Sequence, residues 1–169
     1  MRGLPLTWIW AGLALFGLLF FLGVYGQLPP VVATHFDAVG NPNGYQTKSA
    51  FIAVFLPVML LPNGLFALFY FLADRVPAER MNLPHKAEWL STPQNRALLL
   101  GKLRGSLVET ALFLNLALLF AVQAIYQQNV PGAAFHMPFL AGLVLILGGA
   151  LVLAVRSLFI FRRPPQDPQ

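Results

Sequence analysis

Four long apolar segments, separated by shorter polar ones, divide the chain. A helix needs about 20 apolar residues to cross the hydrocarbon core of a bilayer, and each segment reaches that length. The segments cover residues 6–25, 50–72, 107–126 and 138–161. This pattern predicts an all-α integral membrane protein with four transmembrane helices. We expect residues 1–163 to form a single four-helix membrane domain and residues 164–169 to be a disordered tail.

The first apolar segment follows Arg2, an arrangement that a secretory signal peptide also shows. Its apolar run is longer than the core of a typical signal, and no small-x-small cleavage site follows it. We therefore expect this segment to remain in the protein as the first helix.

The overall composition supports the membrane class. Hydrophobic residues make up 57% of the chain and charged residues only 10%, which is too little charge to cover the surface of a soluble domain. The net charge is +5, and the basic residues lie beside apolar segments. The expected partner is therefore the lipid bilayer with its anionic headgroups, and no nucleic acid. The chain has no cysteines, which excludes disulfides and thiolate metal sites.

The basic residues also predict the orientation in the membrane. One side receives almost all of them, while the segment between the first and second helices has only Lys48. Because Lys and Arg are in excess in cytoplasmic loops, we expect both termini in the cytoplasm and an ordered outer loop between helices 1 and 2. The residues assigned to the cytoplasmic side are Arg2, Arg75, Arg80, Lys86, Arg96, Lys102, Arg104, Arg162 and Arg163.

Proline and glycine predict irregularities in the helical segments. Pro57 and Pro62 predict a kink in the second helix, since proline removes a backbone donor. Thr92 followed by Pro93 is typical of a helix start. The helix that begins there is expected to run along the membrane interface and to bend near Gly101 before it enters the third span.

The outer loop contains a histidine beside an aromatic residue and an acid, in the order His35, Phe36 and Asp37. A histidine in this place could bind a metal, sense pH or hold the loop by hydrogen bonds. Together with His136 of the second outer loop, His35 and Asp37 could supply ligands to zinc. The alternative is a structural histidine that pins the loop to the helix ends. We favour this alternative and expect neither a metal nor another cofactor.

A cluster of turn-forming residues follows in the same loop. Gly40 and Gly44 allow positive backbone angles, and Asn43 and the proline before it suit a tight turn. Tyr45 is then expected to fold back toward the membrane interface, with Lys48 meeting headgroups or capping the outer site. Loops held by a rigid scaffold often carry binding. The candidate residues for binding a ligand or partner are His35, Phe36, Asp37, Gly40, Asn43, Gly44, Tyr45 and Lys48.

Glu109 is the only acid well inside a predicted span. It is a functional candidate because burying its charge is costly. The alternative is that it reaches cytoplasmic water or pairs with Arg104 or Arg156. A proton path from Glu109 through Asn115 to Gln123 would need water or other helices, since its two ends lie about 20 Å apart along a helix.

No motif in the chain indicates an enzyme. The three histidines lie in separate loops, and there is no nucleophile motif, phosphate-binding loop or helical metalloprotease motif. We therefore expect the protein not to be an enzyme.

Two passages resemble a known family. The passage L-P-x-x-V-x-x-H-F-x-x-x-G-x-x-N-G-Y-x-x-K, at residues 28–48, resembles the marker segment of a bacterial membrane family called domain of unknown function 1648. The passage N-L-P-x-K-x-x-W-L, at residues 82–90, resembles a second block of its short members. Ala33 departs from the pattern, because the family commonly has a proline two residues before the histidine.

The resemblance implies a multi-pass protein of the bacterial cytoplasmic (inner) membrane. It gives weight to the outer loop. The cytoplasmic block at residues 80–90, whose prolines and polar residues predict an extended form, would report to, or hold, a cytoplasmic partner. The family is similar in architecture to SdpI-type proteins, multi-spanning immunity proteins that protect against a secreted peptide toxin and take part in signalling its presence. The residues of the cytoplasmic block are Asn82, Pro84, Lys86 and Trp89.

The leading hypothesis is a non-enzymatic inner-membrane protein whose outer loop recognises a peptide ligand or a membrane-protein partner, in SdpI-like toxin immunity or envelope sensing. One alternative is a small transport component, in which the helix with Pro57 and Pro62 moves and Glu109 is the coupling acid. Another is an accessory subunit that stabilises a larger membrane complex. The sequence leaves the oligomeric state open.

Overall fold

The computed structural model describes residues 5–77, 80–133, 138–162 and 164. In this part of the chain the long helices are α1 (Leu6–Gln27), α2 (Lys48–Leu72), α4 (Pro93–Asn129) and α5 (Phe139–Ile160). All four are long and apolar enough to cross a membrane, which confirms the predicted multi-pass membrane class. The shorter elements are β1 (Val31–Phe36), β2 (Pro42–Thr47), the 3₁₀ helix η1 (Ala73–Arg75) and α3 (Lys86–Trp89).

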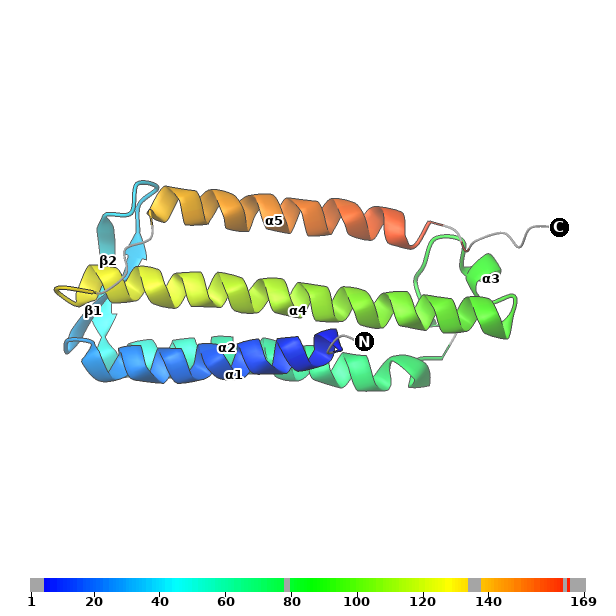
Figure 1. Cartoon of the computed structure of the whole chain (residues 1–169), viewed down its shortest axis with the longest axis horizontal. Helices are drawn as coiled ribbons and strands as arrows, with labels where there is room; N and C mark the ends of the chain where they lie inside the picture. The colour runs from blue at the N-terminus through cyan, green and yellow to red at the C-terminus, as the bar shows by residue number, and fades with distance from the viewer. Residues whose placement is uncertain (1–4, 78–79, 134–137, 163, 165–169) are drawn as a thin grey trace.

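The two ends of the bundle differ. Figure 1 shows β1 and β2 together at one end, which we call the hairpin end, and α3 at the other. We call the opposite end the basic end because most of the described basic residues belong to its segments. Those in η1, α3, the first part of α4 and the chain between them are Arg75, Arg80, Lys86, Arg96, Lys102 and Arg104.

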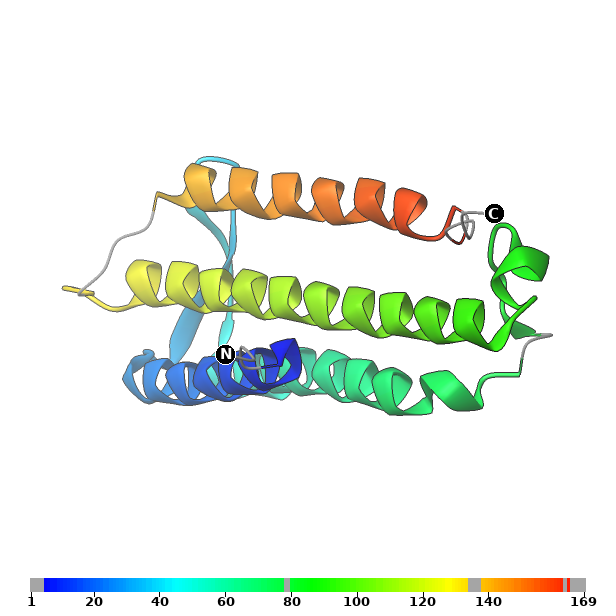
Figure 2. The same ribbon diagram turned by 45° about the vertical axis from the view of Figure 1, so that its right-hand side comes forward.

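α4 is the central helix. It packs against α1 and α2 on one side and against α5 on the other, and two views show it between these neighbours (Figures 1 and 2). Large apolar side chains along α5 are exposed, as a helix surrounded by lipid can tolerate. The main apolar core lies between α1, α2, α4 and β1. Its buried members are Phe21, Val24, Leu28, Val32, Phe51, Met59, Leu118, Val122 and Ile125.

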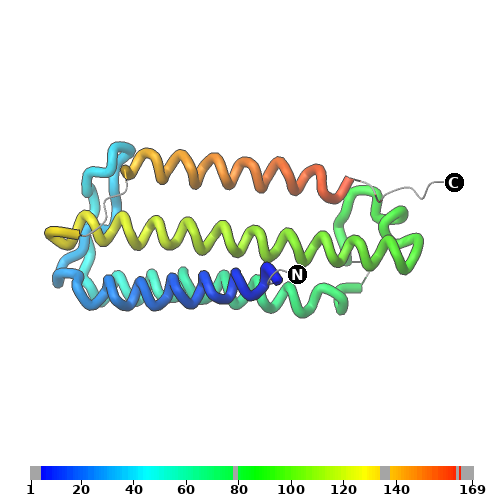
Figure 3. The backbone as a smooth tube through the Cα atoms, viewed as in Figure 1, coloured from blue at the N-terminus to red at the C-terminus, as the bar shows by residue number. Residues whose placement is uncertain are grey.

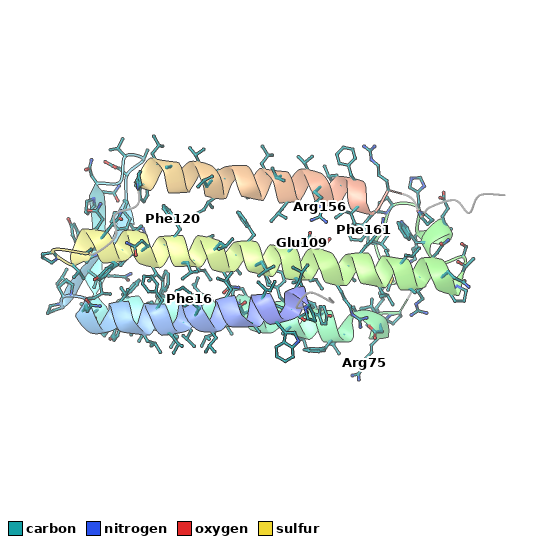
Figure 4. All side chains as sticks on the ribbon, in the orientation of Figure 1. Phe16, Arg75, Glu109, Phe120, Arg156 and Phe161 are labelled. Carbon is teal, nitrogen blue, oxygen red and sulfur yellow. The ribbon has the colours of Figure 1, made fainter. Side chains whose placement is uncertain are left out.

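Two aromatic side chains of α4 fix its contact with α5. A Cβ placed on Gly142 would lie 1.8 Å from Phe120 Cε2, and one placed on Gly149 would lie 2.4 Å from Phe113 Cε2. The two glycines are two helical turns apart, and so are the two rings. The missing side chains therefore let the backbone of α5 approach α4, as small residues do between membrane helices. Figure 4 labels Phe120 on the side of α4 that faces α5.

The segment between α1 and α2 forms a β-hairpin, so the all-α prediction is wrong here. β1 and β2 pair antiparallel, from Val31 opposite Thr47 to Phe36 opposite Pro42. The β-branched and aromatic residues of β1 favour a strand. Val32 supplies the tertiary reason, because its side chain is fully buried in the core between the helices.

α4 is one continuous helix, which Figure 3 shows as an unbroken tube. It begins as predicted, because the Thr92 hydroxyl accepts a hydrogen bond from Asn95 N and Pro93 stands at the first helical position. The predicted interfacial helix with a bend near Gly101 is wrong. A glycine costs a helix only about 1 kcal/mol relative to alanine, and the side chains that follow it tie this part of α4 to the ends of α2 and α5.

Candidate functional site

Asn129, the last residue of α4, closes the free edge of β1. Its side-chain oxygen accepts a hydrogen bond from Ala33 N at 2.8 Å, and its Nδ2 donates to Ala33 O at 2.9 Å. Ala33 is only 3% exposed, so water cannot easily replace Asn129. A proline in this position would have no N–H for the first of these bonds. Having alanine instead of proline at position 33 thus allows both hydrogen bonds between β1 and the end of α4.

Lys48 joins the hairpin to the end of α1. Its backbone N–H donates to Pro30 O at 2.9 Å, and its Nζ donates to Leu28 O at 2.9 Å. Nζ also lies 4.8 Å from the centre of the Tyr25 ring, within reach of a cation–π interaction. Lys48 therefore caps backbone carbonyls at the start of the hairpin.

Asp37 shapes the turn between the strands. Its carboxylate accepts hydrogen bonds from the backbone N–H groups of Val39 and Asn41 and from the Asn41 side chain. These bonds, led by the one from the Asn41 backbone, lower the pKa of Asp37 from its usual value. Gly40 has a positive backbone angle, with φ +92°, and a Cβ on it would lie 2.8 Å from Phe139 Cβ of α5. Asp37 and Gly40 thus have structural roles in the turn.

His35 is exposed on β1, opposite Gly44 of β2. A Cβ on Gly44 would lie 2.9 Å from His35 Cβ, so the glycine makes room for the histidine. Gly44 does not use the positive backbone angle that a glycine allows, in contrast to Gly40. Within the described part of the chain no hydrogen bond holds the His35 ring, so the ring is available to a ligand.

β2 leaves its outer edge open. Tyr45 lies opposite Ala33, whose backbone N–H and C=O both turn away from β2 toward Asn129. In an antiparallel ladder both members of such a pair turn these groups outward, so those of Tyr45 face the far side of β2. No other described segment bonds to them. Tyr45 is 64% exposed, and Asn43, which lies in β2 rather than in the predicted turn, is exposed beside it.

The predicted zinc set of His35, Asp37 and His136 lies only partly in the region that the structure describes. No group of three or more His, Asp or Glu side chains there could hold a metal ion. His136 lies outside the described residues. Phe36 packs against Phe139 of α5, with ring centroids 5.8 Å apart, and so anchors the hairpin to that helix.

The predicted cytoplasmic block folds onto the basic end. Its last part is the short helix α3, so the extended form predicted for it is wrong there. Trp89 is fully buried, and its Nε1 donates to Phe161 O beyond the end of α5. Asn82 and Pro84 are exposed and Lys86 is half-buried. Trp89 is thus an anchor within the bundle, whereas Asn82 and Pro84 lie on its surface.

Glu109 and Arg156 form an ion pair between α4 and α5. Figure 4 shows both side chains in the space between these helices. Of the two partners predicted for Glu109, Arg156 is confirmed, whereas Arg104 pairs with Asp74. The pair satisfies the intramembrane acid within the bundle.

A polar network inside the bundle escaped the sequence analysis. Asn63 of α2 and Asn115 of α4 each donate from Nδ2 to the side-chain oxygen of the other, at 3.2 and 2.8 Å. Trp10 of α1 also donates to Asn63 Oδ1, at 2.8 Å. Since Asn115 is used toward α2 and Glu109 toward α5, direct contacts do not form the path from Glu109 to Gln123. The sequence signal that could have indicated this network is the presence of Asn63 and Asn115 within apolar segments.

Comparison with known proteins identifies the region that holds the hairpin. Residues 12–61 match the family model described as domain of unknown function (DUF1648). This stretch of the chain is therefore similar to the DUF1648 model. No curated protein and no solved structure matches it.

The DUF1648 region comprises most of α1, the hairpin and the first half of α2. It therefore includes His35, Gly44 and Lys48, whereas the second resembling passage, at residues 82–90, lies outside it. Two residues that hold the hairpin also lie outside it, namely Asn129 of α4 and Phe139 of α5. Residues outside the matched region thus also hold the hairpin in place.

Proposed function

We propose that this protein is a non-enzymatic membrane protein whose hairpin recognises an extended peptide, either free or as a segment of a membrane partner. The observation that carries the proposal is the open edge of β2 beside the exposed His35. An edge strand binds an extended peptide through main-chain hydrogen bonds, and side-chain contacts then give specificity. Tyr45 offers the main-chain groups, and the His35 and Tyr45 side chains offer the specific contacts.

The rigid support of the hairpin favours this proposal. Asn129 closes the edge of β1, Lys48 caps the chain before it, and Phe36 packs on α5. These ties leave the edge of β2 as the side on which a further strand can be added. A preorganised edge loses less conformational entropy on binding than a free loop would.

The charge distribution favours an extracytoplasmic position for the hairpin. Lys48 is the basic residue of the hairpin end in the described part of the chain, whereas the segments of the basic end carry many. Under the positive-inside rule both termini and the basic end lie in the cytoplasm. With the bacterial family resemblance, this orientation leads us to propose the cytoplasmic (inner) membrane as the location.

An outer hairpin that pairs with peptides would suit toxin immunity or envelope sensing. The SdpI-type proteins, to which the family is similar in architecture, protect against a secreted peptide toxin. An extended toxin segment is a suitable strand to pair with β2. Asn82 and Pro84, exposed at the basic end, would then be available to a cytoplasmic partner.

We favour recognition over transport because of how the polar residues of α4 are used. Glu109 is paired with Arg156, and Asn115 is bonded to Asn63. A coupling acid needs a polar route across the membrane, and these two contacts lead to different neighbouring helices. The hairpin, in contrast, offers backbone groups that no other described segment uses.

The test is to purify the tagged protein gently from its own membranes and to identify co-purifying peptides and proteins by mass spectrometry. The comparison uses the wild type, His35→Ala, Tyr45→Ala and, as control, Leu145→Ala, which changes an exposed residue on α5. We expect one peptide or protein to be retained by the wild type and the control. Both hairpin variants should lose it about tenfold, as a loss of roughly 1.4 kcal/mol in binding gives.

Protein levels and thermal stability are measured in parallel. Unchanged levels with the specific loss support recognition by the hairpin. Equal recovery of every co-purifying peptide and protein with all four proteins would refute recognition by the hairpin. A loss of the protein itself in His35→Ala would make the histidine structural.

A further inference from the structure

A cavity of about 500 Å³ lies between the first half of α1 and the second half of α2. Small residues open it, namely Ala11 and Ala14 on α1 and Ala67 on α2. Aromatic side chains form much of the remaining wall, including Trp8 and Phe71. This volume is in the range of ligand sites rather than of packing defects.

The amide of Asn63, in the wall of the cavity, is already satisfied. Asn63 lines the cavity, but its side chain is bonded to Trp10, to Asn115 and to the backbone oxygen of Met59. A ligand in the cavity therefore contacts a mostly apolar surface. The chemistry fits a hydrocarbon chain.

The basic end supplies a charge next to this cavity. Arg75 follows the lining residue Phe71 by four positions, at the end of the same helical stretch. Figure 4 shows the Arg75 side chain projecting from the end of α2 on the side away from α4. It is exposed and has no hydrogen bond or ion pair with another described residue, whereas Arg104 is paired with Asp74.

Trp8 marks the level at which a lipid headgroup would lie. It lines the cavity near the start of α1 and is 68% exposed. Tryptophan is enriched at the boundary between hydrocarbon and headgroups. The cavity thus lies beside the hydrocarbon layer, with Trp8 and Arg75 toward the polar boundary.

We propose that this cavity binds one acyl chain of an anionic phospholipid whose phosphate is held by Arg75. The guanidinium group suits a phosphate because its planar fork donates two parallel hydrogen bonds. The chain fills the space between α1 and α2 next to the Trp10–Asn63 hydrogen bond. A bound lipid would therefore stabilise the junction of α1 and α2, independently of what the hairpin recognises.

Tryptophan fluorescence provides the test, because two of the three tryptophans, Trp8 and Trp10, line the cavity and the third is fully buried at α3. The full chain is reconstituted in phosphatidylcholine vesicles. A small fraction of the lipid is phosphatidylglycerol or phosphatidylcholine with brominated acyl chains, which quench on contact. We expect brominated phosphatidylglycerol to quench at about one fifth of the concentration that brominated phosphatidylcholine needs, as one basic contact near the surface provides.

Two matched pairs of variants locate the site. Arg75→Gln should abolish the preference for phosphatidylglycerol, whereas Arg96→Gln, which removes an exposed charge at the start of α4, should keep it. Ala67→Leu should fill the cavity and reduce quenching by both lipids, whereas Ala53→Leu, at an exposed position of α2, should not. Equal quenching by the two lipids in the wild type, or a preference that survives Arg75→Gln, would overturn the proposal.

Native mass spectrometry of the wild type gives a second readout that needs no variant. We expect one phosphatidylglycerol to remain bound after release from mixed micelles. Release of the bare protein, or retention of phosphatidylcholine to the same extent, would count against the site.

Discussion

Basic side chains in this protein complete the ends of helices, in addition to any role in orientation. The last carbonyls of a helix have no intrahelical partner and carry the negative end of its dipole. At three places a Lys or Arg donates to such carbonyls and also lies over an aromatic ring. The three are Lys48 with Leu28 O and Tyr25, Arg104 with Tyr70 O and the Tyr70 ring, and Lys102 with Ile160 O and Trp89.

The Asp37 turn gives a prediction of pH dependence. Hydrogen bonds from Asn41 and Val39 lower the pKa of Asp37, so its folded-state pKa lies below the ordinary value of 3.8. Its contribution to the order of the turn is therefore present above pH 3.8 and is lost as the pH falls through the folded-state pKa. In NMR spectra of the protein in micelles, the backbone amides of Val39 and Asn41 should shift with a midpoint below 3.8.

Asp37→Asn is the matched variant for this titration. It keeps the shape of the side chain but cannot ionise, so the shift of the two amides below pH 4 should disappear. A midpoint at or above the ordinary pKa of aspartate in the wild type would show that the carboxylate does not hold the turn.

The residue-scale contacts explain what the sequence could and could not reveal about the site. His35, Asp37 and the glycines could be selected because their types suit a turn or a ligand. Their partners could not be deduced, since Asn129 meets Ala33 across 96 positions and Asn63 meets Asn115 across 52. Such pairs depend on how the helices pack, which no local pattern specifies.

At the scale of elements, the sequence predicted the apolar spans well because length and hydropathy decide them. It missed the hairpin for a physical reason. β1 is short and its burial comes from helices distant in the chain, so no long alternating pattern marks it. It also missed the continuity of α4, because the contacts that keep the helix straight near Gly101 come from α2 and α5.

The contact of α5 with α4 gives a prediction at this scale. Gly149→Val should place a side chain against Phe113, whereas Gly148→Val should meet open space, since nothing lies within 4 Å of a Cβ there. Both changes put the same residue into the same helix, so the difference between them reports packing alone. We expect Gly149→Val to lower the free energy of unfolding by about 1–3 kcal/mol more than Gly148→Val does.

Unfolding of both variants in mixed micelles with increasing fractions of a denaturing detergent measures this difference. Adding Phe113→Ala to Gly149→Val should recover part of the loss, because the valine then occupies the space of the ring. Equal stability of the two valine variants would mean that α5 is not seated on α4 through this glycine.

At the scale of the whole molecule, the basic residues and the open strand edge of the hairpin lie at opposite ends of the bundle. The basic end holds most of the described Lys and Arg residues, and the hairpin end holds the open strand. The proposed recognition of a peptide from outside the cell and the proposed lipid site at the basic end both follow from this separation. The proposed recognition therefore depends directly on the orientation of the protein in the membrane.

The absence of native cysteines allows the orientation to be measured directly. Val39→Cys places a thiol in the hairpin turn, and Ala87→Cys places one in α3, both at exposed positions. A membrane-impermeant maleimide added to spheroplasts should label the first at once and the second only after the membrane is permeabilised, because the positive-inside rule directs the basic end to the cytoplasm. The opposite pattern would place the hairpin in the cytoplasm. A peptide arriving from outside could then not reach β2, and the search for its ligand would have to move to the interior of the cell.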